Sequence, residues 1–278
     1  MGKHAYTEVP SMKFALIQMH TTKDKQENLR IATDFIRRAA QAGARVAILP
    51  EMFCCPYSNN AFPVFAEERG GLVHTTMATA ARENHITLVA GSMPERCGDA
   101  LYNTSFVFDE NGCEIACHRK IHLFDAYIDG GQHFRESATL SPGSSRTLFT
   151  VDGIAMGLCI CFDIRFPELF RAMALDGAQA VIVPAAFNMT TGPLHWDLTF
   201  RMRAVDNQLF TLGVAPARDT ARSYVSYAHS TVCSPWGQQI ARAGTDETML
   251  LVDVDFDQIP EVRRQLPLLS ARRPDAYN

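Results

Sequence analysis

Gly157-Leu-Cys-Ile-Cys-Phe-Asp-Ile-Arg-Phe-Pro-Glu-Leu169 is the stretch of sequence that decides the fold. It starts inside an apolar run over residues 154–160, which predicts a buried strand. Pro167 and Glu168 are typical of a first helical turn, because proline lacks the N–H that this turn leaves unpaired and a carboxylate suits the positive end of the helix dipole. Cys161 therefore lies where a buried strand gives way to a helix.

This position gives Cys161 two interpretations. A nearby helix N-terminus can favour a thiolate, and backbone N–H groups at such a turn can bind a developing oxyanion. A lone cysteine, however, usually behaves as a small buried hydrophobic residue. The stretch alone leaves catalysis and packing both open.

The composition describes an ordinary globular chain of 278 residues, 47% hydrophobic and 20% charged. Its net charge is −4 and no Lys/Arg cluster is present, so we expect no nucleic-acid partner. No apolar run approaches the roughly 18 residues that span a bilayer, so we expect no membrane association. We expect residues 1–11 to be a loose leader before a single domain over residues 12–278.

The eight cysteines include no Cys-x-x-Cys pair and no Cys/His set with zinc spacing, so no metal site is expected. The N-terminal residues carry no apolar stretch of the kind found in signal peptides. A chain of this size without a secretion signal indicates reduced thiols and a cytoplasmic location.

Strands and helices alternate along the chain, which favours an α/β fold. We expect helices at residues 24–42, 71–85, 166–175 and 195–208, and a loop at 54–63. Expected strands lie at residues 13–19, 46–49, 86–90, 180–183, 209–214, 227–234 and 249–255, with a hairpin of 101–109 and 114–119.

An internal echo indicates two related halves. Gly43-Ala-Arg-Val-Ala-Ile-Leu-Pro-Glu-Met-Phe53 is similar to Gly177-Ala-Gln-Ala-Val-Ile-Val-Pro-Ala-Ala-Phe187, about half the chain later. Two such halves, each with helices on one face of a sheet, predict a layered α-β-β-α sandwich. Glu51 of the first copy is replaced by Ala185 in the second. Because a carboxylate at the end of a buried strand is costly without partners, we expect Glu51 to serve chemistry.

Three stretches resemble the signatures of the nitrilase superfamily of carbon–nitrogen hydrolases, and they stand in that family's order. They are Leu49-Pro-Glu-Met-Phe53, His118-Arg-Lys-Ile-His122 and Ile160-Cys-Phe-Asp-Ile-Arg-Phe-Pro-Glu168. The resemblance covers roughly residues 12 to 277. It implies a four-layer sandwich of two pseudo-symmetric halves, a Glu-Lys-Cys catalytic set, a homodimer, and neither a metal nor an organic cofactor.

Further stretches resemble the omega-amidase branch of that superfamily. They are Glu136-Ser-Ala-Thr-Leu-Ser-Pro-Gly143, Phe187-Asn-Met-Thr-Thr-Gly-Pro-Leu-His-Trp196, Arg203-Ala-Val-Asp-Asn-Gln208, Pro216-Ala-Arg-Asp219 and Ser223-Tyr-Val225. The chain departs from the pattern at Phe162, where Tyr is common, and at Cys159, where Gly is common. We interpret Cys159 as a packing residue.

Amide hydrolysis needs a nucleophile, a proton carrier and an oxyanion donor. A thiol needs an adjacent base, so Cys161 is assigned as the nucleophile and Glu51 as the base. The ammonium of Lys120, together with the N–H of Phe162, would bind the oxyanion. The alternative for Glu51 and Lys120 is an ordinary ion pair. By resemblance, Glu136 is a second carboxylate that positions Lys120 or assists the base; its alternative is a solvated loop residue.

Arg165 follows Cys161 by four residues and could bind a substrate carboxylate with two hydrogen bonds. The alternative is a structural ion pair with Glu168 or Asp163. By resemblance, Phe187 and Thr191 line the pocket, and the substrates are dicarboxylate monoamides such as alpha-ketoglutaramate and alpha-ketosuccinamate.

Three other functions stay open at this point. They are a sibling amidase acting on deaminated glutathione, a nitrilase, and a non-catalytic scaffold. The sequence also leaves open whether His195 and Trp196 belong to the pocket wall or to the core. The apolar stretch Leu266-Pro-Leu-Leu269 is a candidate for crossing between the two subunits of a homodimer.

Overall fold

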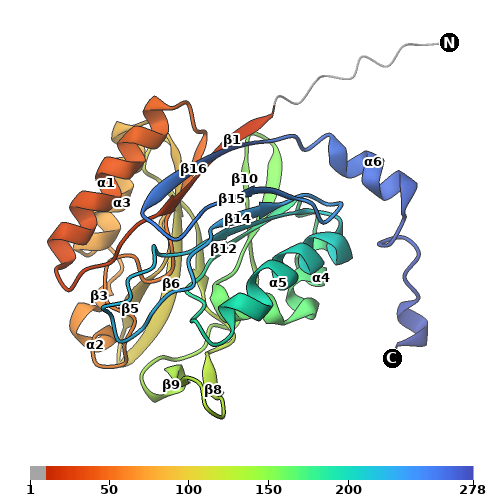
Figure 1. Ribbon diagram of the computed structural model, residues 1–278. Helices are drawn as coiled ribbons and strands as arrows, with labels where there is room; N and C mark the ends of the chain where they lie inside the picture. The colour runs from red at the N-terminus through yellow and green to blue at the C-terminus, as the bar shows by residue number, and fades with distance from the viewer. Residues whose placement is uncertain (1–10, 278) are drawn as a thin grey trace.

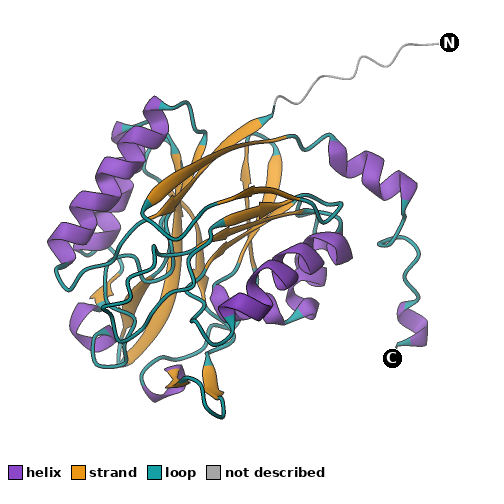
Figure 2. Cartoon of the chain, viewed as in Figure 1, coloured by secondary structure: helices purple, strands orange, loops and turns teal. Residues whose placement is uncertain are grey.

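The computed structural model describes residues 11–277. All but one residue of the expected leader therefore lies outside the described residues, and the division into a leader and one domain stays a prediction. Two β-sheets pack face to face, and helices cover their outer faces (Figures 1 and 2). This is the expected four-layer α-β-β-α sandwich.

The first sheet has eight strands in the order β16-β1-β2-β4-β6-β5-β3, with β7 paired to β6. Its strands are β1 Met12–Gln18, β2 Val46–Ile48, β3 Glu67–Glu68, β4 Thr87–Val89, β5 Met93–Cys97, β6 Ala100–Phe108, β7 Glu114–Arg119 and β16 Thr248–Val254. The helices of this half are α1 Lys25–Gln41, α2 Phe62–Phe65 and α3 Leu72–Glu83.

The second sheet has six strands in the order β10-β11-β12-β13-β14-β15. They are β10 Thr147–Val151, β11 Ile154–Leu158, β12 Ala180–Pro184, β13 Phe210–Val214, β14 Thr231–Cys233 and β15 Gln239–Arg242, and the helices of this half are α4 Pro167–Leu175 and α5 Gly192–Asn207. A small hairpin, β8 Asp125–Tyr127 with β9 His133–Arg135, stands apart, and α6 Gln258–Gln265 leads into the tail.

The internal echo corresponds to a repeated strand–helix–strand unit. In the first half β1 runs parallel to β2 with α1 between them in sequence, and in the second half β11 runs parallel to β12 with α4 between them. A parallel pair needs such a crossover, and its strands end at the same edge of the sheet. Glu51, after β2, and Cys161, after β11, therefore each lie at the carboxyl-terminal edge of the parallel pair in their own sheet.

Three hydrophobic clusters separate the four layers. One lies between the first sheet and its helices, one between the two sheets, and one between the second sheet and its helices. Strand β1 shows how alternation divides them: Phe14 and Leu16 face the other sheet, whereas Ala15 and Ile17 face α1.

The structure differs from the sequence prediction in several elements, among them β3 and the β8–β9 hairpin, which were not expected. Strand β5, with Pro94 and two charged residues, was not expected, nor was β15. The expected loop at 54–63 runs into α2 at its end. The strand expected at 227–234 begins only at Thr231, because Ala228 and His229 adopt a left-handed backbone that no strand accommodates.

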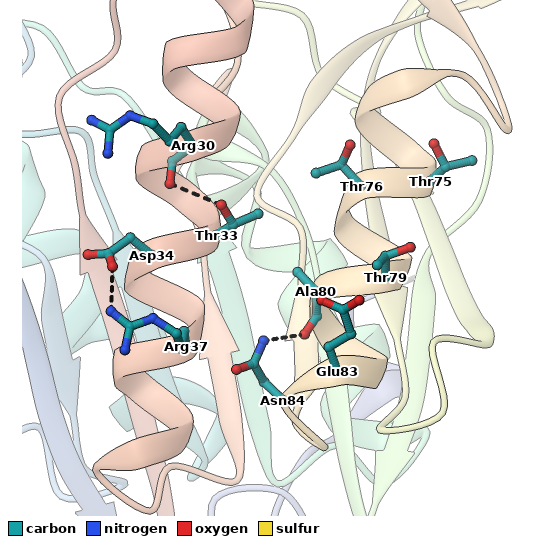
Figure 3. A pocket seen from close by; sticks show the side chains of 10 residues that line it. All are labelled: Arg30, Thr33, Asp34, Arg37, Thr75, Thr76, Thr79, Ala80, Glu83 and Asn84. Carbon is teal, nitrogen blue, oxygen red and sulfur yellow. Dashed lines mark hydrogen bonds and ion pairs between the residues drawn. The ribbon is translucent and has the colours of Figure 1, made fainter.

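None of the described helices is long and apolar enough to cross a membrane. A wide polar groove runs between the outer faces of α1 and α3 (Figure 3), and it contains none of the predicted site residues. Some of its polar groups pair within their own helices: Arg37 pairs with Asp34, and the Asn84 amide donates to the Ala80 carbonyl. This groove therefore presents no reason to expect chemistry there.

Candidate active site

Glu51 lies in the turn that follows β2 and is buried. The neighbouring loop supports this turn through two hydrogen bonds. The Met52 N–H donates to the Ser92 hydroxyl at 3.0 Å, and the Ser92 N–H donates to the Pro50 carbonyl at 3.3 Å. Gly91 passes so close that a Cβ atom there would lie 2.1 Å from the Pro50 oxygen, so only glycine fits.

Lys120 follows β7, and its side chain is 0% exposed. Its ammonium donates to Glu51 Oε1 and to Glu136 Oε1, each at 2.9 Å. Burial alone would lower the pKa of Lys120, but the two carboxylates raise it well above its usual value. The lysine therefore stays an ammonium, and the pair is part of a three-residue cluster.

Glu136 is fully buried, which excludes the alternative of a solvated loop residue. Besides the lysine it accepts the Phe124 N–H at 2.6 Å and the Tyr57 hydroxyl at 2.5 Å. A carboxylate with several donors is fixed in place. The contacts agree with a positioning role for Glu136.

Cys161 opens a 3₁₀ turn, Cys161–Arg165, that connects β11 to α4. Its backbone is left-handed, with φ +47°, which is strained for a residue other than glycine. Asp163 holds the turn by accepting the Ile160 N–H at 3.0 Å. Its carboxylate also contacts His118 Nε2 at 3.1 Å and His122 Nδ1 at 2.8 Å. These contacts join the lysine segment to the cysteine turn.

The surroundings of the Cys161 thiol favour its neutral form. Burial raises its pKa well above the usual value, and the neighbouring Glu51 carboxylate raises it further. These two effects oppose the thiolate that a nearby helix start can favour. Burial also raises the pKa of Glu51, whereas Lys120 lowers it, and the net shift is upward. A base with a raised pKa beside a neutral thiol suits proton transfer between the two.

A small cavity adjoins the cysteine and contains all three residues predicted to bind substrate. It is lined by Phe124, Cys161, Phe162, Arg165, Ala186, Phe187, Asn188, Thr191 and Tyr224. Thr191 donates to Asn188 Oδ1 at 3.2 Å, which fixes its hydroxyl at the wall. The predicted pocket residues are thus brought together around the nucleophile.

Arg165 makes no ion pair with any carboxylate among the described residues. Its carbon Cζ lies 4.8 Å from the centre of the Phe187 ring, and Nη1 is 3.0 Å from His195 Nδ1. The alternative of a structural pair with Asp163 is wrong, because that carboxylate is taken by two histidines.

His195 belongs beside the pocket, because it contacts Arg165. Trp196 is a core residue whose indole donates to the His229 carbonyl.

Sequence reasoning missed three residues of this site. Tyr57 and Tyr224 pack with their ring centres 4.4 Å apart, beside the cavity, and the Asn103 amide donates to Glu51 Oε1 at 2.8 Å. Tyr57 carries no signal, because it lies in an irregular loop. Asn103 does carry a sequence signal, because it is a polar residue in the middle of a strand that the pattern predicts to be buried.

Residues 13–264 match the model of the carbon-nitrogen hydrolase family. This chain belongs to that family. The match confirms the resemblance that the three signature stretches indicate, and it covers both halves of the sandwich.

Individual carbon-nitrogen hydrolases support the finer comparison. The chain is 45% identical over 267 residues to omega-amidase NIT2 of Mus musculus, which covers 96% of this chain and 97% of that protein. It is 38% identical to Saccharomyces cerevisiae Nit3, a member of branch 10 of the nitrilase superfamily, with a TM-score of 0.87 and coverage of 95% and 97%. An amidase from Nesterenkonia, solved with acrylamide, is 27% identical with a TM-score of 0.81 and coverage of 96% of each chain. The predicted family, branch and fold are confirmed.

Proposed function

We propose that this carbon-nitrogen hydrolase is an omega-amidase that converts small dicarboxylate monoamides to the acid and ammonia. One observation carries the proposal: Cys161, which neighbours the buried Glu51–Lys120 pair, shares its cavity with Arg165, and no carboxylate of the described residues pairs with that cation. The similarity to omega-amidase NIT2 supports it.

The first half of the reaction forms a thioester. Glu51 takes the thiol proton while the Cys161 sulfur attacks the amide carbon. The resulting oxyanion is bound by the Lys120 ammonium and the Phe162 N–H. When the C–N bond breaks, the protonated Glu51 returns its proton to the departing ammonia.

The second half releases the acid. Glu51, ionised again, removes a proton from a water molecule, and the hydroxide attacks the thioester carbon. The same two donors bind the second oxyanion. The C–S bond then breaks, and the sulfur regains a proton from Glu51, which restores the neutral thiol that burial favours at rest.

Arg165 selects the substrate by binding its far carboxylate. The guanidinium lies against Phe187 on the cavity wall, so a bound carboxylate would be largely shielded from water. Charge-assisted pairs are strong in such surroundings. By resemblance to the omega-amidase branch, the substrate is a short monoamide such as alpha-ketoglutaramate or alpha-ketosuccinamate. The homodimer and the cytoplasmic location belong to this proposal as well.

The test compares a charged monoamide with an uncharged amide of the same length, following ammonia release. For the charged substrate, Arg165→Ala should lower kcat/KM by about 10²-fold or more, because a buried carboxylate loses its partner. For the uncharged amide the loss should be much smaller. Arg165→Lys should restore little of the lost kcat/KM, because a single ammonium cannot make the two parallel hydrogen bonds of a planar guanidinium.

Mass spectrometry of the wild type with substrate provides the control for the reaction itself. It should detect a thioester on the peptide that contains Cys161, and Cys161→Ala should show neither adduct nor ammonia. Equal losses on both substrates in Arg165→Ala would contradict carboxylate recognition, and an adduct on another cysteine alone would contradict the mechanism.

A further inference from the structure

The two oxygens of the Glu51 carboxylate have different surroundings. Oε1 accepts hydrogen bonds from the Lys120 ammonium at 2.9 Å and from the Asn103 amide at 2.8 Å. Oε2 is buried and has no hydrogen-bond partner among the described residues. The Tyr57 hydroxyl lies 3.5 Å from Oε1 as well, so all the donors around this carboxylate face one oxygen and the other is left with its lone pairs available.

Asn103 connects both members of the Glu51–Lys120 pair. Its side-chain amide donates to Glu51, and its backbone carbonyl accepts the Lys120 N–H at 2.9 Å. Asn103 lies in the middle of β6 and is fully buried, so it cannot turn to solvent. Because an ionised carboxylate only accepts hydrogen bonds, the amide must present its NH₂ group to Oε1.

We propose that Asn103 is a positioning residue that makes Oε2 the oxygen of Glu51 that takes and returns the proton. The donor at Oε1 keeps that oxygen occupied, so the proton of the thiol, and later that of the water, goes to Oε2. The same bond fixes the rotation of the carboxylate relative to the Lys120 backbone. This inference rests on the proposed function of Glu51 as the base.

The first test is the pH dependence of Asn103→Leu, which keeps the size of the side chain and removes the donor. Loss of a hydrogen bond to the ionised form raises the pKa of Glu51. A base must be ionised to act, so the acid limb of kcat/KM should move to higher pH, by about one unit. We expect kcat at neutral pH to fall about 10-fold or more. KM should change little, because Asn103 does not line the substrate cavity.

The second test, Asn103→Asp, keeps the shape and adds a titrating group. At low pH the new carboxyl group is protonated and can donate to Oε1, so activity should approach that of the wild type. As the pH rises the group ionises and repels Glu51. The ratio of kcat/KM of the variant to that of the wild type should therefore fall at least about 10-fold with rising pH.

Ser105→Ala is the matched control, since Ser105 is a buried polar residue two positions along the same strand and its hydroxyl has no hydrogen-bond partner among the described residues. It should leave the acid limb where it is. Thermal unfolding of each variant reports on folding separately. The proposal would be overturned if the acid limb of kcat/KM did not shift in Asn103→Leu. It would also be overturned if the ratio of the Asn103→Asp kcat/KM to that of the wild type did not change with pH. Failure of the base assignment itself would show differently, as full activity in Glu51→Gln.

Discussion

At the scale of single residues, the reactivity of Cys161 depends on the groups that surround it. The thiol has a raised pKa because it is buried and faces Glu51, so it does not act as a preformed thiolate. Its left-handed backbone costs on the order of 1–3 kcal/mol, and the Asp163 contacts hold the turn in spite of that strain. The activating group is therefore the base, and the oxyanion site depends on Lys120.

Lys120→Arg should lower kcat by about 10²-fold or more. The substitution keeps the charge, but a planar guanidinium cannot place one compact cation between Glu51 and Glu136 and also reach the oxyanion. The magnitude is that of losing one oxyanion donor. Steady-state kinetics measure it.

The matched control is Lys25→Arg, because Lys25 also pairs with a glutamate, Glu67, and its other hydrogen bond goes to the Phe65 carbonyl and not to a catalytic residue. Its kcat should stay within about twofold of the wild type, since a partly exposed ion pair contributes little. A near-normal kcat in Lys120→Arg would make Lys120 a structural residue only.

At the scale of elements, the position of Glu51 depends on the loop between β4 and β5. Gly91 has φ +41° and passes against the Pro50 carbonyl, and Ser92 supports Met52 from the other side. The loop therefore sets the turn that carries the base. We therefore expect a substitution in this loop to lower kcat, although the loop contains no catalytic group.

Gly91→Ala should therefore lower both stability and kcat. Its Cβ would meet the Pro50 oxygen at 2.1 Å, so the turn before Glu51 has to move. We expect a loss of at least about 2 kcal/mol in the free energy of unfolding, from strain plus overpacking. Urea unfolding and kinetics measure the two effects.

Gly98→Ala separates backbone strain from the clash. Gly98 also has a positive φ, +58°, but a Cβ there meets no atom within 4 Å. It should cost about 1–2 kcal/mol and leave kcat unchanged. Equal kcat values in the two variants would show that the loop does not set the position of the base.

The same elements show what the sequence could predict. The β6–β7 hairpin, α1 and the junction at Cys161 follow from local periodicity and turn residues, and the structure has them. Glu51, Lys120 and Cys161 were identified from the motifs that carry them. Asn103 and Tyr57 were not, because their roles arise from contacts 52 and 79 residues away in sequence, which no local pattern encodes.

At the scale of the whole molecule, one outer face remains apolar. Leu194, Leu198 and Met202 recur every four residues along α5 and are 73%, 65% and 46% exposed. Side chains at this spacing form one stripe on a helix. Leu266, in the stretch predicted to cross between subunits, is 44% exposed, and its carbonyl accepts the Gln208 amide at the end of α5.

We predict that this face joins two copies of the chain in solution, because a contiguous apolar stripe is unfavourable in water and a two-fold contact brings it against itself. Light scattering of the wild type at micromolar concentration should give the mass of a dimer. Leu198→Glu places a charge in the centre of the stripe and should give a monomer, since an unpaired buried charge is costly. Val64→Glu, at an apolar residue on α2 that is even more exposed than Leu198, should stay dimeric. A monomeric wild type would contradict the homodimer, and a dimeric Leu198→Glu would place the interface elsewhere, with the Leu266-Pro-Leu-Leu269 stretch as the next surface to substitute.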